Sequence, residues 1–141
     1  MIVPDVSRWK SLGSTDNADM YEVEPGVLAV VPHERCVDTA ETARQSVEFQ
    51  HRHWAAEGRG GGALIFVDRI RDQHAGARQV YGSLPDPGRV RGFALVGGTV
   101  FGRAVASVFL GLNRPAAPTK MFGDLHAALA WLRELNQKGG G

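Results

Sequence analysis

The segment GRGGGALIFVD, residues 58–68, contains the clearest structural pattern of the chain. Five consecutive apolar residues, 63–67, follow a run of glycines and stop at an aspartate. A strand that is apolar at every position, rather than at alternate positions, is typical of a strand covered on both faces. We therefore expect residues 63–67 to form a central strand of a largely parallel sheet, with helices packed against it.

The segments upstream of this strand predict a helix and a hairpin. Residues with helical spacing form one stripe: Ala40, Ala43, Val47, Gln50 and Trp54. We expect this helix to begin at Asp38, which has capping-box spacing to Glu41, and to end at Gly58. Further upstream, residues 20–24 and 27–31 flank the turn Pro25-Gly26 and predict an antiparallel hairpin.

The downstream half repeats the alternation of helices and strands. We expect a helix over residues 73–81, a buried strand over 92–96, a third helix over 100–112 and a last strand over 119–122. Asp124 is expected to cap a final helix. The expected order β-β-α-β-α-β-α-β-α indicates one α/β domain, with a mixed, mostly parallel sheet of about five strands and about four helices.

The ends of the chain differ in composition from this domain. Residues 1–18 are polar and contain several turn formers, so we expect a loosely ordered lead-in. Residues 19–137 contain all the patterned segments and make up the expected domain. Residues 138–141 are expected to form a flexible glycine tail.

Composition excludes several classes of protein. The formal net charge of the 141 residues is only +1, which argues against a nucleic-acid-binding protein. Cys36 is the single cysteine, so the chain has no internal disulfide and suits a reducing compartment. Neither a signal peptide nor an apolar run of about 20 residues is present. We therefore expect a soluble, cytoplasmic protein without a transmembrane segment.

The stretch VFLGLNRPAAPTKMFGDLHAALAWL, residues 108–132, resembles the C-terminal end of small bacterial proteins described as STAS/SEC14 or SpoIIAA-like. They share a hydrophobic helix, an Asn-x-Pro link, a short strand ending in phenylalanine and a last helix with Ala-x-x-Trp-Leu. The matching residues here are Asn113, Pro115, Pro118, Phe122, Ala128, Trp131 and Leu132. The run IFVDRIRD, residues 65–72, also looks like their central strand. The resemblance covers about residues 20–136 and implies a STAS-like fold that works by binding.

The best-understood members of that family are anti-sigma-factor antagonists with a phosphorylatable serine or threonine after the central strand. The corresponding residues here, 68–77, read DRIRDQHAGA and contain no hydroxyl side chain. A phosphate would add nearly two negative charges at a helix N-terminus. We therefore expect a regulatory interaction module that does not use this phosphoswitch, and we interpret Asp72 as an ordinary helix-start aspartate.

Ligands of parallel sheets gather at the carboxyl ends of the strands. Here that edge would combine a strand-to-helix turn, whose amides can hold an anion, with arginines, whose guanidinium groups suit carboxylates and phosphates. The candidate partner- or anion-binding residues are Asp68, Arg69, Arg71, Asp72, Arg78, Gly97, Gly98, Thr99 and Arg103. A tight turn and solvated arginines without any ligand are the alternative interpretation.

The expected helix over residues 100–112 is apolar around most of its circumference, which indicates burial on more than one side. Core packing, a homodimer interface and a groove for a small hydrophobic ligand, as in SEC14-like proteins, all fit this pattern. The candidate residues for a groove or dimer face are Phe101, Val105, Val108, Phe109, Leu112 and Trp131.

No pattern predicts catalysis, a cofactor or a metal. Cys36 and His33 are the only local pair of nucleophile and base, and they lack an orienting third group. His51 and His53 are two residues apart, so a helix directs them to different sides. We therefore expect a protein that is not an enzyme, holds no cofactor and no metal, and binds a partner protein.

Overall fold

The computed structural model describes residues 1–139, except for 101, 105 and 108–115. The strands are β1 (Lys10–Ser14), β2 (Ala18–Glu24), β3 (Val27–Pro32), β4 (Cys36–Asp38), β5 (Gly61–Phe66), β6 (Ile70–Gln73), β7 (Val90–Val96) and β8 (Thr119–Phe122). The helices are α1 (Ala40–Glu57), α2 (Ala75–Ser83), α4 (Leu125–Lys138) and the 3-10 turn Val67–Arg69. The described residues at 100, 102–104 and 106–107 are also helical.

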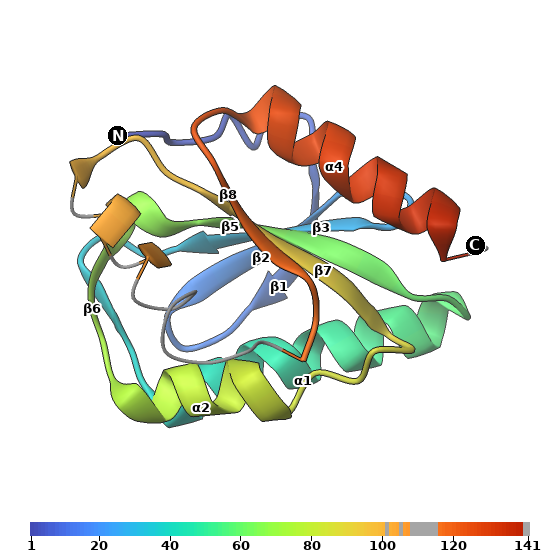
Figure 1. Ribbon diagram of the computed structural model, residues 1–141, viewed down its shortest axis with the longest axis horizontal. Coiled ribbons are helices and arrows are strands. Elements are labelled where there is room, and N and C mark those ends of the chain that lie inside the picture. The colour runs from blue at the N-terminus through green and yellow to red at the C-terminus, as the bar shows by residue number, and fades with distance from the viewer. Residues whose placement is uncertain (101, 105, 108–115, 140–141) are drawn as a thin grey trace.

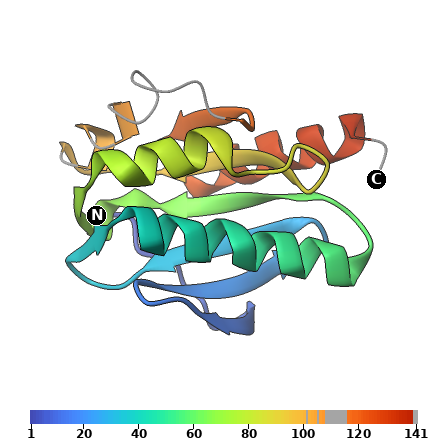
Figure 2. The same ribbon diagram turned by 90° about the horizontal axis from the view of Figure 1, so that it is seen from below.

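The main sheet has six strands in the order β1-β2-β3-β5-β7-β8. Strands β3, β5, β7 and β8 are parallel, while β1 and β2 pair antiparallel at one edge. Helices α1 and α2 lie side by side over one face of the sheet, and α4 covers the other face with the N-terminal segment (Figures 1 and 2). The expected α/β architecture, with its opening hairpin, central strand and capped last helix, is confirmed.

Three strands were not predicted. Strand β1 lies inside the segment expected to be an irregular lead-in, and the main sheet therefore has six strands instead of about five. Its sequence, KSLGS, is mostly exposed and interrupted by a register shift, so it carries no alternation of apolar residues. Strands β4 and β6 form a separate parallel pair of only 3 and 4 residues, too short for a periodic pattern. The division into lead-in, domain and tail stays a prediction.

The start of α1 differs from the expected capping box. Thr39 is the N-cap, and its hydroxyl accepts a hydrogen bond from the Thr42 amide while the Thr42 hydroxyl accepts one from the Thr39 amide. Asp38 is the last residue of β4, one position before this cap, and its side chain is buried instead. The helix ends as predicted at Gly58, which adopts a left-handed conformation with φ 69°.

The core consists of one apolar cluster on each face of the sheet. The buried stripe of α1, which includes Val47 and Trp54, packs against the first face. Ala128 and Leu132 of α4 pack against the second face, together with Trp9 of the N-terminal segment. No helix in the described part of the chain has the length and apolar character that crossing a membrane requires.

Candidate functional site

Asp68 joins the carboxyl ends of β5 and β7. Its side chain is buried, and Oδ2 accepts the amides of Ile2 at 2.7 Å and Gly98 at 2.8 Å. Oδ1 accepts the amide of Thr99 at 3.0 Å and its hydroxyl at 2.8 Å. Burial raises the pKa of Asp68, but the hydrogen bonds from these groups outweigh it and hold the pKa below the usual value. The carboxylate is therefore an internal anion with four donors.

This geometry favours the alternative interpretation of residues 97–99, a tight turn without an external ligand. The amides of Gly98 and Thr99 already bind the carboxylate of Asp68. A bound anion would have to displace that buried side chain, which has lost its own solvation. The turn is therefore part of the scaffold that fixes this edge of the sheet.

An open groove of about 530 Å³ lies beside Asp68. Its walls come from the first residue of the chain, the turn after β3 and the segment after β5: Met1, Glu34, Arg35, Asp68, Arg69, Ile70 and Arg71. The Nε atom of Arg69 is buried and has no hydrogen-bond partner within the described part of the chain. The groove is lined by three arginines and two carboxylates, those of Asp68 and Glu34. Asp68 already accepts four hydrogen bonds from backbone amides and a hydroxyl. The positive charge therefore predominates, and the groove favours a negatively charged ligand.

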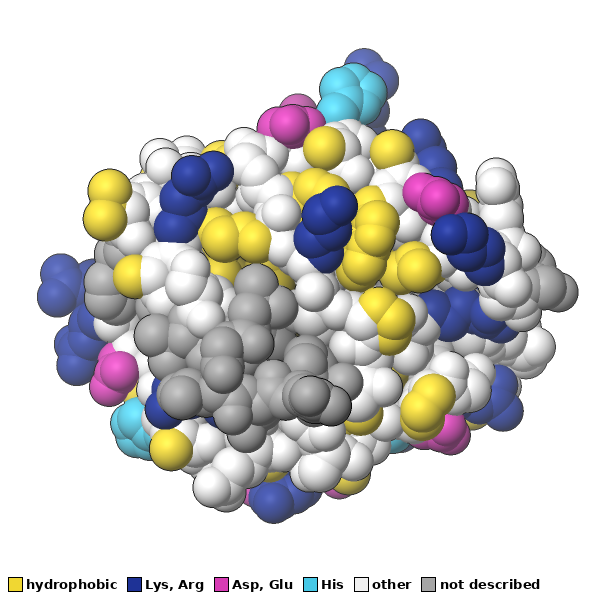
Figure 3. Space-filling view, viewed as in Figure 1, with side chains coloured by type: hydrophobic (Ala, Val, Ile, Leu, Met, Phe, Trp, Pro, Cys, Tyr) yellow, Lys and Arg dark blue, Asp and Glu magenta, His cyan; other side chains and the backbone are white. Residues whose placement is uncertain are grey.

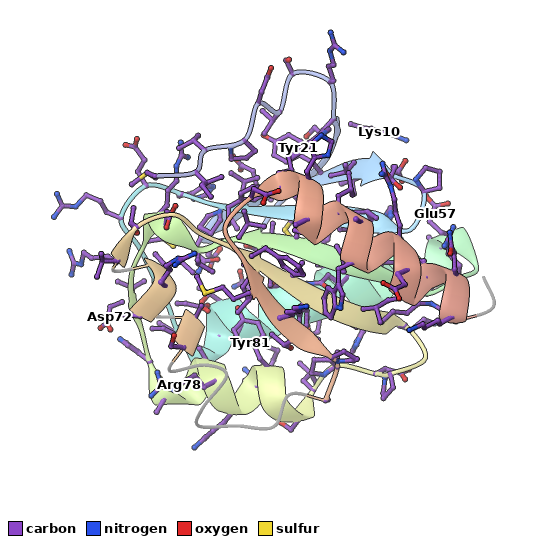
Figure 4. All side chains as sticks on the ribbon, turned by 45° about the horizontal axis from the view of Figure 1, so that its top comes forward. Lys10, Tyr21, Glu57, Asp72, Arg78 and Tyr81 are labelled. Atoms are coloured by element: carbon purple, nitrogen blue, oxygen red, sulfur yellow. The ribbon has the colours of Figure 1, made fainter. Side chains whose placement is uncertain are left out.

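The structure brings only some of the predicted edge residues into this groove. Arg69 and Arg71 line it, whereas Asp72, Arg78 and Arg103 do not. Arg78 donates a hydrogen bond to the Gln73 carbonyl at 3.1 Å, and both Asp72 and Arg78 lie at the same side of the molecule (Figure 4). Asp72 belongs to β6 and not to a helix start, which corrects its interpretation as a helix-start residue.

Asp38 is a functional candidate that the sequence analysis missed. It is buried between β4, α1 and α2, where its carboxylate accepts hydrogen bonds from the hydroxyl of Thr42 at 2.8 Å and of Tyr81 at 2.9 Å. The side-chain amide of Gln73 donates a third hydrogen bond, at 3.2 Å. Burial raises the pKa of Tyr81 well above its usual value, and the Asp38 charge and hydrogen bond add to that rise. The capping-box spacing predicts Asp38 as the helix cap because Asp38 directly precedes Thr39, which is the N-cap of α1.

Asp38, Gln73 and Tyr81 line a cavity of about 40 Å³, together with the polar side chains of Asn17 and Ser46. The apolar side chains that line it include Val67, Phe93 and Leu95. The Cys36 thiol also lines the cavity, and burial together with the Asp38 charge raises its pKa to about 11. With this pKa the thiol of Cys36 stays protonated at neutral pH. It is therefore a poor nucleophile, because the thiolate is the reactive form of cysteine.

Most of the predicted apolar groove lies outside the described residues, namely Phe101, Val105, Val108, Phe109 and Leu112. Trp131 is described and packs against Phe122 at 5.5 Å between ring centres, in the cluster beneath α4. Ala106 belongs to the cluster on the opposite face of the sheet. The described part of the expected helix and Trp131 therefore do not line one groove.

The face formed by α4 and β8 carries hydrophobic side chains with single basic side chains between them (Figure 3). Lys120 extends over the Phe122 ring, with its ammonium nitrogen 5.5 Å from the ring centre. Because each apolar patch is interrupted by a charge, this face offers less continuous apolar contact area than an extended docking surface would.

Comparisons with known proteins identify a family but no reaction. A family model described as "Domain of unknown function (DUF7793)" matches residues 21–136. Curated protein sequences give no significant match. One similar solved structure is described as an uncharacterized protein from the DUF3478 family with a SpoIIAA-like fold, from Shewanella loihica PV-4. It is 16% identical, with a TM-score of 0.49, and the similarity covers 94% of this chain and 99% of that one.

Proposed function

This chain belongs to the family of domains described as DUF7793, and we propose that it is a non-catalytic binding module whose arginine-lined groove holds an acidic segment of a partner protein. The observation that supports this most is the buried Nε of Arg69, which lacks a partner within the described part of the chain and belongs to a side chain that lines the groove. A carboxylate in the groove would give this guanidinium the planar, paired acceptor that it prefers.

The composition of the groove favours a peptide over a nucleic acid. Ile70 and Met1 supply apolar contact, while Glu34 repels a uniformly anionic chain. The volume lies within the range of about 300–1,000 Å³ that is common for ligand sites. A segment that combines acidic and apolar side chains satisfies all of these groups together, and the net charge of +1 offers little attraction to a polyanion.

The same groups favour binding over proton transfer. The guanidinium groups of Arg35, Arg69 and Arg71 donate hydrogen bonds and accept none, so they are suited to holding an anion. Asp68 is engaged by four donors and cannot act as a base without breaking them. The groove is therefore suited to orienting and holding a charged group.

We expect peptides selected from a random library against this protein to be enriched in aspartate and glutamate. Reversing charge in Arg69→Glu or Arg71→Glu should weaken a selected peptide at least about tenfold, because each change replaces attraction by repulsion and a tenfold change corresponds to about 1.4 kcal/mol. Fluorescence anisotropy with a labelled selected peptide measures the dissociation constant.

The matched control is Arg52→Glu, which reverses an exposed arginine on α1 that does not line the groove. It should leave peptide affinity unchanged while altering the net charge by the same amount. Selected peptides without acidic residues, or equal weakening by all three reversals, would show that the groove is not the docking site.

A small hydrophobic ligand, as in SEC14-like proteins, is the alternative function. The interior cavity of about 40 Å³ gives it little support, because ligand sites commonly exceed about 300 Å³. Native mass spectrometry of gently purified protein separates the two proposals. We expect a species without a bound small molecule, either a monomer or a homodimer. A co-purified molecule that is lost on denaturation would favour the ligand-binding alternative.

A further inference from the structure

A second cluster of polar side chains lies at the C-terminal half of α1. His53 and Glu57 are one turn apart on this helix, and Glu22 faces them from β2. The His53 Nε2 atom is 3.6 Å from Glu22 Oε2 and 3.9 Å from Glu57 Oε1. None of these three residues lines the arginine-lined groove. Glu57 lies at the opposite end of the molecule from Asp72, which directly follows the groove residue Arg71 (Figure 4).

The imidazole of His53 has an unsatisfied nitrogen in this cluster. Its side chain is only 11% exposed, and Nε2 is buried without a hydrogen-bond partner within the described part of the chain. The distances to the two carboxylates exceed those of a hydrogen bond. Two carboxylates and a nitrogen without a hydrogen-bond partner therefore face one another. A cation placed between them would be attracted by all three groups.

The spacing of the three groups suits a metal ion. Zinc binds nitrogen and oxygen at about 2.0–2.2 Å, so neighbouring ligand atoms on a tetrahedron are about 3.4 Å apart. The three ligand atoms here all lie within 4.8 Å of one another, and small side-chain rotations would close that difference. Glu57 is 48% exposed, which leaves a fourth position open to water.

We propose that Glu22, His53 and Glu57 bind one divalent cation of the zinc class and thereby tie the end of α1 to β2. Histidine nitrogen with two carboxylates is a ligand set that zinc accepts. The histidine spacing that was considered in the sequence could not reveal this site, because two of the ligands are glutamates and one of them comes from another element. Lys10 is opposite Glu22 in the register of β1 and β2, but the described residues show no ion pair between the two side chains.

Titration of the untagged protein with zinc chloride tests this site. Isothermal titration calorimetry should show one zinc ion per chain, and cobalt chloride should produce the visible absorption of a low-symmetry four-coordinate site. His53→Ala should abolish the one-to-one binding. Glu57→Gln should weaken it, and because Glu57 is exposed, this variant keeps the fold even if His53→Ala does not.

The control is His126→Ala, which removes an exposed histidine of α4. It should bind zinc like the original protein. The proposal is overturned if the original protein binds no stoichiometric zinc, if Glu57→Gln binds it with unchanged affinity, or if His126→Ala lowers the affinity as much as the cluster variants do.

Discussion

Replacing Asp68 with alanine is expected to lower the free energy of unfolding by about 3–5 kcal/mol, because buried donors would lose their acceptor. The amides of Ile2, Gly98 and Thr99 and the hydroxyl of Thr99 all donate to this carboxylate. The change would also remove the hydrogen bond that ties the Ile2 amide to the carboxyl ends of β5 and β7. Urea unfolding followed by tryptophan fluorescence measures the change.

The matched control is Asp124→Ala. Asp124 caps α4 with one hydrogen bond to the Ala127 amide at an exposed position, so its loss should cost only about 0.5–2 kcal/mol. Equal destabilisation by the two variants would mean that the four donors to Asp68 contribute no more than one exposed cap.

The dependence of stability on pH gives the same prediction a second readout. The folded pKa of Asp68 lies below its ordinary value of 3.8, so the carboxylate stabilises the fold above that value. This contribution is lost as the pH falls through the lowered folded pKa. As the pH falls below about 4, the original protein should therefore lose more stability than Asp68→Ala does. Parallel curves for the two proteins would contradict the assignment.

Replacing Asp38 with alanine has the second largest expected effect, a loss of about 2–4 kcal/mol. The hydroxyl of Tyr81 and the amide of Gln73 would lose the carboxylate that accepts their hydrogen bonds. The Thr42 hydroxyl would lose less, because the Thr39 carbonyl is 3.1 Å away. Urea unfolding measures the total cost, and hydrogen exchange in α2 should report where it falls.

Tyr81→Phe is the control for this prediction, since it removes one donor and leaves the carboxylate with two others. Its expected cost is about 1 kcal/mol. Asp38→Ala should also lower the pKa of Cys36, because the Asp38 charge contributes to its rise to about 11. Faster alkylation of Cys36 at alkaline pH would show this. An unchanged alkylation rate and a cost no larger than that of Tyr81→Phe would contradict the central role of Asp38.

The elements that the sequence predicted are those whose environment is uniform along their length. Strand β5 is covered on both faces, so every residue is apolar, and α1 meets the core along one stripe. Strand β1 has no such environment, because most of its residues are exposed at the edge of the sheet. Strand β1 forms through backbone hydrogen bonds with β2, and this pairing requires no particular pattern of side chains in the sequence.

The functional residues show a similar division. The carboxyl edge of the sheet could be located from the strand order, and two arginines expected at that edge, Arg69 and Arg71, line the groove beside Asp68. The occupant of the glycine turn could not be predicted, because a carboxylate from one loop and amides from another have no fixed spacing in the chain. The hydrogen bond between Asp38 and Tyr81 could not be predicted either, because the two residues come from separate elements with no fixed spacing in the chain.

The hydrogen bond from the Ile2 amide to Asp68 has a practical consequence for handling the protein. It holds the first residues against the carboxyl edge of the sheet, and Met1 itself lines the groove. An affinity tag or fluorescent label fused before Met1 would therefore emerge inside the surface that one wants to study. The C-terminal end of α4 lies on the other side of the molecule, so immobilisation through that end leaves the groove open to an analyte (Figure 1).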